Sequence, residues 1–211
     1  MKEIKGGVCA ALGFKASAIA AEIKYRGRDD MAMVYSESPC VAAGTFTTNV
    51  VKAAPVKWDM KVVHERGSAR AVVVNTGIAN ACTGEEGMQV VRSTAEAAAV
   101  ALGVESGEVL IGSTGVIGMQ LPEEKLTAGA GSLAKALERS PEAANRAARA
   151  IMTTDTHEKE IAYELEIGGK TVRVGGMSKG SGMIQPNMAT MLCVLTTDVP
   201  LEAQTDRKSV V

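Results

Sequence analysis

The chain has few aromatic residues and almost no net charge, and these shortages exclude several classes of protein. Phe, Trp and Tyr make up 3% of the 211 residues, which leaves no obvious platform for stacking nucleic-acid bases. Lysine and arginine number 23 against 24 acidic residues, so the chain also lacks the basic field of a nucleic-acid binder. With 46% hydrophobic residues, it has enough apolar surface to form a globular core rather than a disordered chain.

Histidine is nearly absent, which leaves little material for metal sites and proton relays. Only His64 and His157 occur, and His157 lacks the second histidine that a zinc-peptidase motif requires. There is no GxGxxG, and Lys179 precedes Gly180 in an order that a phosphate-binding loop does not use. We therefore expect no metal and no resident cofactor.

The cysteines contain no Cys-x-x-Cys pair, which argues against a metal knuckle. They are Cys9, Cys40, Cys82 and Cys193. A chain of this length does not need disulfides to stabilise its core, so we expect buried free thiols.

A targeting or membrane segment is not apparent. Residues 1–7 mix charges and have no apolar centre, unlike a signal peptide. The longest uncharged run, 180–197, contains Gly182 and Pro186 and would make a poor membrane span. We expect a soluble cytoplasmic protein that binds neither membranes nor nucleic acid.

Apolar periodicity predicts a mixture of strands and helices. The expected strands are 31–35, 71–75, 109–111 and 190–195; the expected helices are 88–102, one that starts at Pro122, and one from Ser140 to about 151–152. Residues 161–167 and 171–174 alternate around Gly168-Gly169, which predicts a β-hairpin. We expect turns at Thr76-Gly77 and at 112–115. The predicted class is α+β, with mixed sheet layers covered by helices.

The segment 175–197 is chemically unusual, because a glycine-rich stretch leads into an apolar strand at Thr190. One interpretation is a plain loop before a core strand. The other is that Thr190 is a nucleophile, which needs a nearby base. Its own α-amino group, with a reference pKa of roughly 7.7–8.0, would serve once the Ala189–Thr190 bond is cut. The Thr190 hydroxyl could cut that bond by attacking the Ala189 carbonyl.

The sequence resembles the bifunctional ornithine acetyltransferase / glutamate N-acetyltransferase family of arginine biosynthesis. The stretch 179–192 is similar to the self-cleavage motif of that family. Further similar blocks follow in family order over nearly the whole chain, at 44–49, 52–56, 75–84, 113–118 and 150–156.

The resemblance implies self-cleavage between Ala189 and Thr190, with residues 1–189 as the α chain and residues from 190 as the start of a β chain. Thr190 would then take the acetyl group from N-acetylornithine and pass it to glutamate; acetyl-CoA is a possible co-substrate. The implied fold is an α/β sandwich, and the implied assembly contains two α and two β chains.

The resemblance also assigns site residues. Thr114 and Gly115 match the oxyanion-hole pair, where one donor is worth about 3 kcal/mol of barrier. Thr153 matches a substrate-binding threonine, although the spacing barely separates it from Thr154. Lys179 matches a substrate-binding lysine suited to a carboxylate, and Thr190 is the nucleophile.

Three departures from the family pattern stand out. His157-Glu158-Lys159 replaces a usual Pro-Lys, and Asn75-Thr76-Gly77-Ile78 carries Thr and Ile where Ser and Asn are common. The β chain is expected to continue for roughly another domain. Residues 206–211 do not resemble the family, and we expect a truncated gene with an artefactual tail.

Two other functions remain open from the sequence. One is an N-terminal-threonine amidohydrolase or aminopeptidase of related architecture, which would release its acyl group to water. The other is an inactive fragment that folds without its full site. Acetyl transfer from N-acetylornithine to glutamate, measured against hydrolysis, separates the three.

Overall fold

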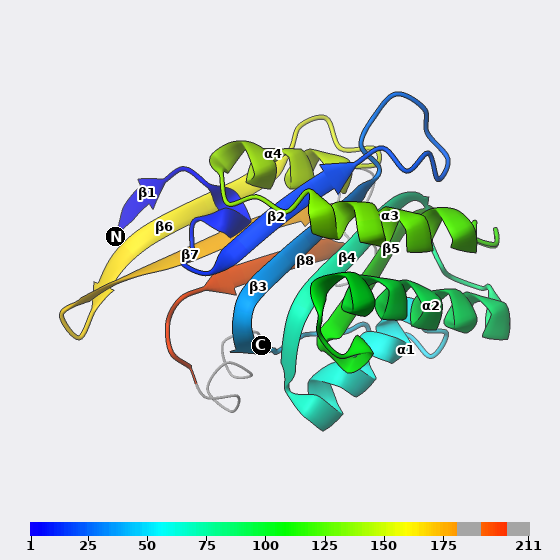
Figure 1. The fold of residues 1–211 in the computed structure, drawn as a ribbon, viewed down its shortest axis with the longest axis horizontal. Helices are drawn as coiled ribbons and strands as arrows, with labels where there is room; N and C mark the ends of the chain where they lie inside the picture. The colour runs from blue at the N-terminus through cyan, green and yellow to red at the C-terminus, as the bar shows by residue number, and fades with distance from the viewer. Residues whose placement is uncertain (181–190, 202–211) are drawn as a thin grey trace.

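Two four-stranded sheets and their covering helices form the part of the chain that the structure, a computed structural model, describes: residues 1–180 and 191–201 (Figure 1). The strands are β1 (Lys2–Ile4), β2 (Phe14–Ile19), β3 (Met31–Val41), β4 (Ser68–Ile78), β5 (Val109–Val116), β6 (Lys159–Ile167), β7 (Lys170–Lys179) and β8 (Leu192–Thr197). The longer helices are α1 (Ala54–Lys61), α2 (Gly84–Leu102), α3 (Glu123–Lys135) and α4 (Pro141–Ala150). Short helical turns lie at Gly7–Cys9, Val62–Arg66 and Ser106–Glu108.

One sheet, called here the mixed sheet, has the order β2-β3-β4-β5. Its first two pairings are antiparallel, whereas β4 and β5 run parallel and are joined by the crossover helix α2. The carboxyl ends of β4 and β5 therefore lie at the same edge of the sheet. Polar side chains at these two ends are brought together by topology.

The other sheet, called here the hairpin sheet, has the order β1-β6-β7-β8 and is antiparallel throughout. Its centre is the predicted hairpin: Ile167 pairs with Lys170 across Gly168-Gly169, and both glycines have positive φ. A two-residue turn of this kind needs positive φ at both central positions, which glycine supplies without strain. The predicted hairpin is confirmed.

Side-chain alternation places the mixed sheet between two apolar layers. On β3, Met31 and Met33 pack on the side of α2 and α3, whereas Ala32 and Val34 pack on the side of α4 and β7. The same period of two follows along β4, where Val73 and Val74 face opposite cores. The layered α+β class predicted from the sequence is confirmed.

Helices α3 and α4 begin where their sequences predict, whereas α2 begins at Gly84 and not at the expected residue 88, and α1 was not predicted. Ser140 caps α4 by accepting a hydrogen bond from the Ala143 N–H at 3.1 Å, and Pro141 occupies the first turn. Pro122 precedes α3, and Glu123 and Glu124 lie in its first turn, where negative charge favours the helix dipole.

The expected turns at Thr76-Gly77 and at 112–115 are wrong. β4 continues to Ile78 and β5 continues to Val116, and the two segments pair with each other residue by residue. β7 likewise extends through Gly175 and Gly176 to Lys179, in the glycine-rich stretch for which a plain loop was one interpretation. Strand pairing in each case satisfies backbone groups in glycine-rich sequence, which local propensity alone disfavours.

The four cysteines form no disulfide in the described part of the chain, and their expected burial holds for only one. Cys9 is buried, Cys40 is half-buried, and Cys82 and Cys193 are exposed.

Helix α1 covers the outer edge of the mixed sheet. The Trp58 indole N–H donates to the Val109 carbonyl at 2.8 Å, and the Ile111 N–H donates to the Asp59 carboxylate at 2.9 Å. Two side chains thus take up groups that an edge strand leaves unpaired. Burial raises the pKa of Asp59 to about 8, against the opposing effect of the Ile111 N–H.

Candidate active site

The parallel ends of β4 and β5 form the floor of the candidate site. Thr76 pairs with Thr114, and Gly77 pairs with Gly115. Gly115 has φ +138°, and an added Cβ would overlap the Gly77 carbonyl carbon, so only glycine fits this close approach. The position of Gly115 is therefore set by backbone packing between the two strand ends.

Thr76 connects the end of β4 to the end of α4. Its side chain is fully buried, and its hydroxyl lies 3.1 Å from the Ala150 carbonyl at the end of α4. The Asp30 carbonyl lies 3.3 Å from the same hydroxyl. Thr76 is thus a structural contact between the mixed sheet and α4.

Lys179, at the end of β7, reaches across from the hairpin sheet to this floor. Its Nζ lies 3.1 Å from the Thr114 Oγ1, and both side chains are buried, with 3% and 8% of each residue exposed. The two residues are 65 positions apart in sequence. Lys179 is therefore not a solvated surface lysine.

The carboxylate of Asp155 accepts hydrogen bonds from three residues near the contact between Lys179 and Thr114. Its Oδ1 accepts hydrogen bonds from the Lys159 Nζ at 2.5 Å and from the Gly180 N–H at 2.9 Å. Its Oδ2 accepts from the Thr153 N–H at 3.3 Å. One carboxylate therefore fixes both the residue that follows Lys179 and the predicted substrate threonine.

The charges of this cluster are interdependent. Burial acts to raise the pKa of Asp155, but the hydrogen bonds from Lys159, Gly180 and Thr153 outweigh it and lower the value to about 2. Burial lowers the pKa of Lys179, partly opposed by the negative charge of Asp155 and reinforced by the positive charge of Lys159. Asp155 is therefore ionised at neutral pH and favours the ammonium form of Lys179.

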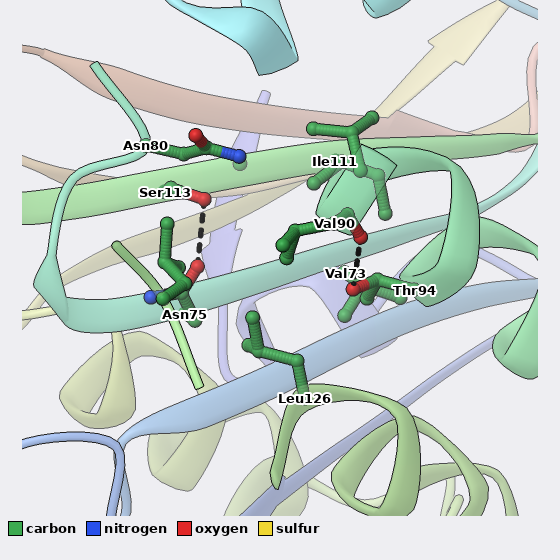
Figure 2. A pocket seen from close by; sticks show the side chains of 11 residues that line it. Val73, Asn75, Asn80, Val90, Thr94, Ile111, Ser113 and Leu126 are labelled. Atoms are coloured by element: carbon green, nitrogen blue, oxygen red, sulfur yellow. Dashed lines mark hydrogen bonds between the residues drawn. The ribbon is translucent and has the colours of Figure 1, made fainter. Parts of the chain in front are cut away.

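A small cavity lies on the opposite face of the mixed sheet, between the sheet and helices α2 and α3. Its volume is about 10 Å³, close to the room needed by one water molecule. Figure 2 shows Asn75 and Ser113 at this cavity, where the Ser113 hydroxyl donates to the Asn75 Oδ1 at 2.6 Å. The Asn75 amide also donates to the Ile78 carbonyl. These contacts connect the ends of β4 and β5 on the side of the sheet that faces α2 and α3. The cavity is not part of the Thr114 site.

Three of the predicted site residues lie together: Thr114, Gly115 and Lys179. Thr153 joins them through its N–H to Asp155, whereas Thr154 is exposed. Ala189 and Thr190, the predicted cleavage site and nucleophile, lie outside the described residues. Sequence reasoning did not single out Asp155. The available signal was a carboxylate directly after Thr153-Thr154, within a block that resembles the family.

Two further observations concern the described residues only. None of their helices is both long and apolar enough to cross a membrane. None of their histidine, cysteine and acidic side chains gather in groups of three that could hold a metal ion.

Fold and site together define a layered α+β protein with a buried hydroxyl–ammonium pair between its two sheets. Known proteins of similar sequence identify the family within this class. The sequence model of the ArgJ family matches residues 15–210, and the chain belongs to that family.

A relative of similar sequence is the arginine biosynthesis bifunctional protein ArgJ of Symbiobacterium thermophilum. It is 50% identical over 211 residues, which cover 99% of this chain and 52% of that protein. The chain spans about half the length of the curated relatives it matches.

Two solved structures share the fold. The ArgJ protein of Bacillus halodurans superposes with a TM-score of 0.83 at 40% identity, over 89% of this chain and 98% of that one. The ornithine acetyltransferase of Mycobacterium tuberculosis, solved in complex with ornithine, gives a TM-score of 0.80 at 41% identity. The alignment covers 90% of this chain and 99% of that one.

Proposed function

We propose that this chain supplies the self-cleavage segment and half of the active site of an acetyltransferase of arginine biosynthesis. The enzyme moves an acetyl group from N-acetylornithine to glutamate. The observation that carries the proposal is the buried Lys179–Thr114 contact beside Gly115, directly before the segment that holds Thr190. Membership of the ArgJ family favours acetyl transfer over the amidohydrolase alternative.

Self-cleavage comes first. The Thr190 oxygen attacks the Ala189 carbonyl carbon, and the oxyanion that forms is stabilised by donors at Thr114 and Gly115. The Ala189 carbon–nitrogen bond breaks, and the Thr190 nitrogen leaves with the proton of the hydroxyl. Water then hydrolyses the resulting ester, which frees an Ala189 carboxylate and a Thr190 with an α-amino group.

Acetyl transfer uses the freed Thr190. Its amine takes the hydroxyl proton as the oxygen attacks the acetyl carbon of N-acetylornithine, and ornithine departs with that proton. The amine of glutamate then attacks the acetyl-threonine ester. N-acetylglutamate leaves and the Thr190 hydroxyl regains a proton. Thr153 and Lys179 bind substrate, and acetyl-CoA is a possible second acetyl donor.

The remaining features of the proposal are an assembly of two α and two β chains, no resident cofactor, and a place in the cytoplasm. The α chain comprises residues 1–189, and the β chain begins at Thr190.

Replacement of the nucleophile tests the proposal. In a full-length precursor that carries this chain, Thr190→Ala should abolish both self-cleavage and acetyl transfer, because one hydroxyl serves both reactions. Thr190→Ser should retain part of each. Mass spectrometry detects the two chains, and a transfer assay scored against release of acetate excludes a hydrolase. Two chains from the alanine variant would contradict the assignment.

A further inference from the structure

The contact between Lys179 and Thr114 has a direction that chemistry fixes. An ammonium group can donate hydrogen bonds but cannot accept them, so the Thr114 oxygen is the acceptor at 3.1 Å. A hydroxyl has one hydrogen and two lone pairs. With one lone pair engaged by Lys179, the hydroxyl hydrogen of Thr114 must point away from the lysine.

That hydrogen has no acceptor among residues 1–180 and 191–201. Thr114 is 8% exposed, and its hydroxyl takes part in one hydrogen bond there, the one that it receives from Lys179. A buried hydroxyl normally uses its donor. Among the described residues, the O–H of Thr114 is therefore left to donate to another group.

We propose that Lys179 is a positioning residue for the oxyanion hole: it directs and polarises the Thr114 hydroxyl so that its hydrogen faces the developing oxyanion. This inference rests on the proposed function and extends it, since substrate binding by Lys179 would concern a carboxylate and not Thr114. A charge-assisted donor also strengthens the hydrogen bond that the acceptor makes in turn.

The surroundings of Lys179 suit this role. The groups that act on its charge are Asp155, which stabilises the ammonium form, and Lys159, which opposes it. Asp155 also holds the Gly180 N–H, which fixes the backbone just beyond Lys179. The ammonium is thereby held in one place beside Thr114.

Self-cleavage separates the two roles of Lys179, because that reaction involves no free substrate carboxylate. In the full-length precursor, Thr114→Val removes the hydroxyl at nearly constant volume and should slow cleavage by about 10²–10³-fold. Lys179→Met removes the donor and should slow cleavage roughly tenfold or more. In the Thr114→Val background, Lys179→Met should change the rate by less than about twofold, since it acts through a hydroxyl that is gone.

The matched control is Lys170→Met, because Lys170 is exposed at the other end of the same strand. This variant should cleave at the wild-type rate. Circular dichroism establishes that each variant is folded. Lys179→Gln keeps an N–H donor and should retain more activity than Lys179→Met. Cleavage at the wild-type rate by folded Lys179→Met would overturn the inference. So would a double variant whose loss in cleavage rate equals the product of the losses in the two single variants. Failure of the wild-type precursor to cleave would instead contradict the proposed function.

Discussion

The two sheets hold their parts of the site in different ways. The mixed sheet fixes Thr114 and Gly115 by backbone packing, because Gly115 leaves no room for a side chain against Gly77. The end of β7 in the hairpin sheet is held through the ionised carboxylate of Asp155, which lies in the loop before β6 and accepts the Gly180 N–H. The first arrangement does not depend on pH, whereas the second depends on a charge. The site thus combines strand ends that are fixed by backbone packing with the end of β7, whose position depends on an ionised carboxylate.

The largest effect should come from breaking the rigid floor. Gly115→Ala places a Cβ into the Gly77 carbonyl at φ +138°, and should lower the free energy of unfolding by about 3 kcal/mol or more. Gly118→Ala is the matched control, because φ is +74° there but nothing lies within 4 Å of an added Cβ. It should cost about 1 kcal/mol. Equal losses in urea unfolding of the two variants would refute the proposed role of the close approach.

The next effect should come from neutralising Asp155. Asp155→Asn should cost about 2 kcal/mol at pH 7, since the native pKa is about 2 against an unfolded value of about 3.9. A lowered native pKa stabilises the fold above the unfolded pKa, and this contribution is lost as the pH falls toward about 2. Urea unfolding of the wild type and the variant should therefore converge in acid.

Glu164, a carboxylate on β6 of the hairpin sheet, provides the control for Asp155. Glu164 pairs with Arg173 at 3.0 Å, and each side chain is about a third exposed at 30% and 32%. Glu164→Gln should cost less than about 1 kcal/mol, because water screens the pair. A loss as large as that of Asp155→Asn would show that burial does not distinguish the two carboxylates.

The last prediction concerns a slope with pH and not a single loss, because the mixed sheet has a charge-sensitive contact of its own at its edge. The pKa of Asp59 is raised to about 8, so the folded state binds an extra proton between about pH 4 and that value. Stability should fall with rising pH in this window, by at most about 1.4 kcal/mol per unit. Asp59→Asn keeps an acceptor for the Ile111 N–H and should flatten the profile of Tm against pH. An unchanged slope would remove Asp59 as its cause.

Local sequence was sufficient for the elements whose signals lie within one short segment. Gly168-Gly169 between alternating strands predicts the hairpin, and Ser140-Pro141-Glu142 predicts the start of α4; the structure has both. The turns expected at Thr76-Gly77 and 112–115 were wrong, because the pairing of β4 with β5 overrides local propensity. The resemblance to the family selected Thr114, Gly115 and Lys179, and their roles stay predictions.

By itself, then, the sequence determined the α+β class, the hairpin, the starts of α3 and α4 and the family, since each depends on local periodicity, capping or an ordered set of motifs. Tertiary structure alone decided that the Lys179 ammonium is buried against Thr114, that Asp155 joins Thr153 to Gly180, and that Gly115 abuts Gly77. These contacts join residues on different strands and loops, and no local pattern encodes which of them meet. Burial strengthens the polar contacts among these, because charge and hydrogen bonding act far more strongly away from water.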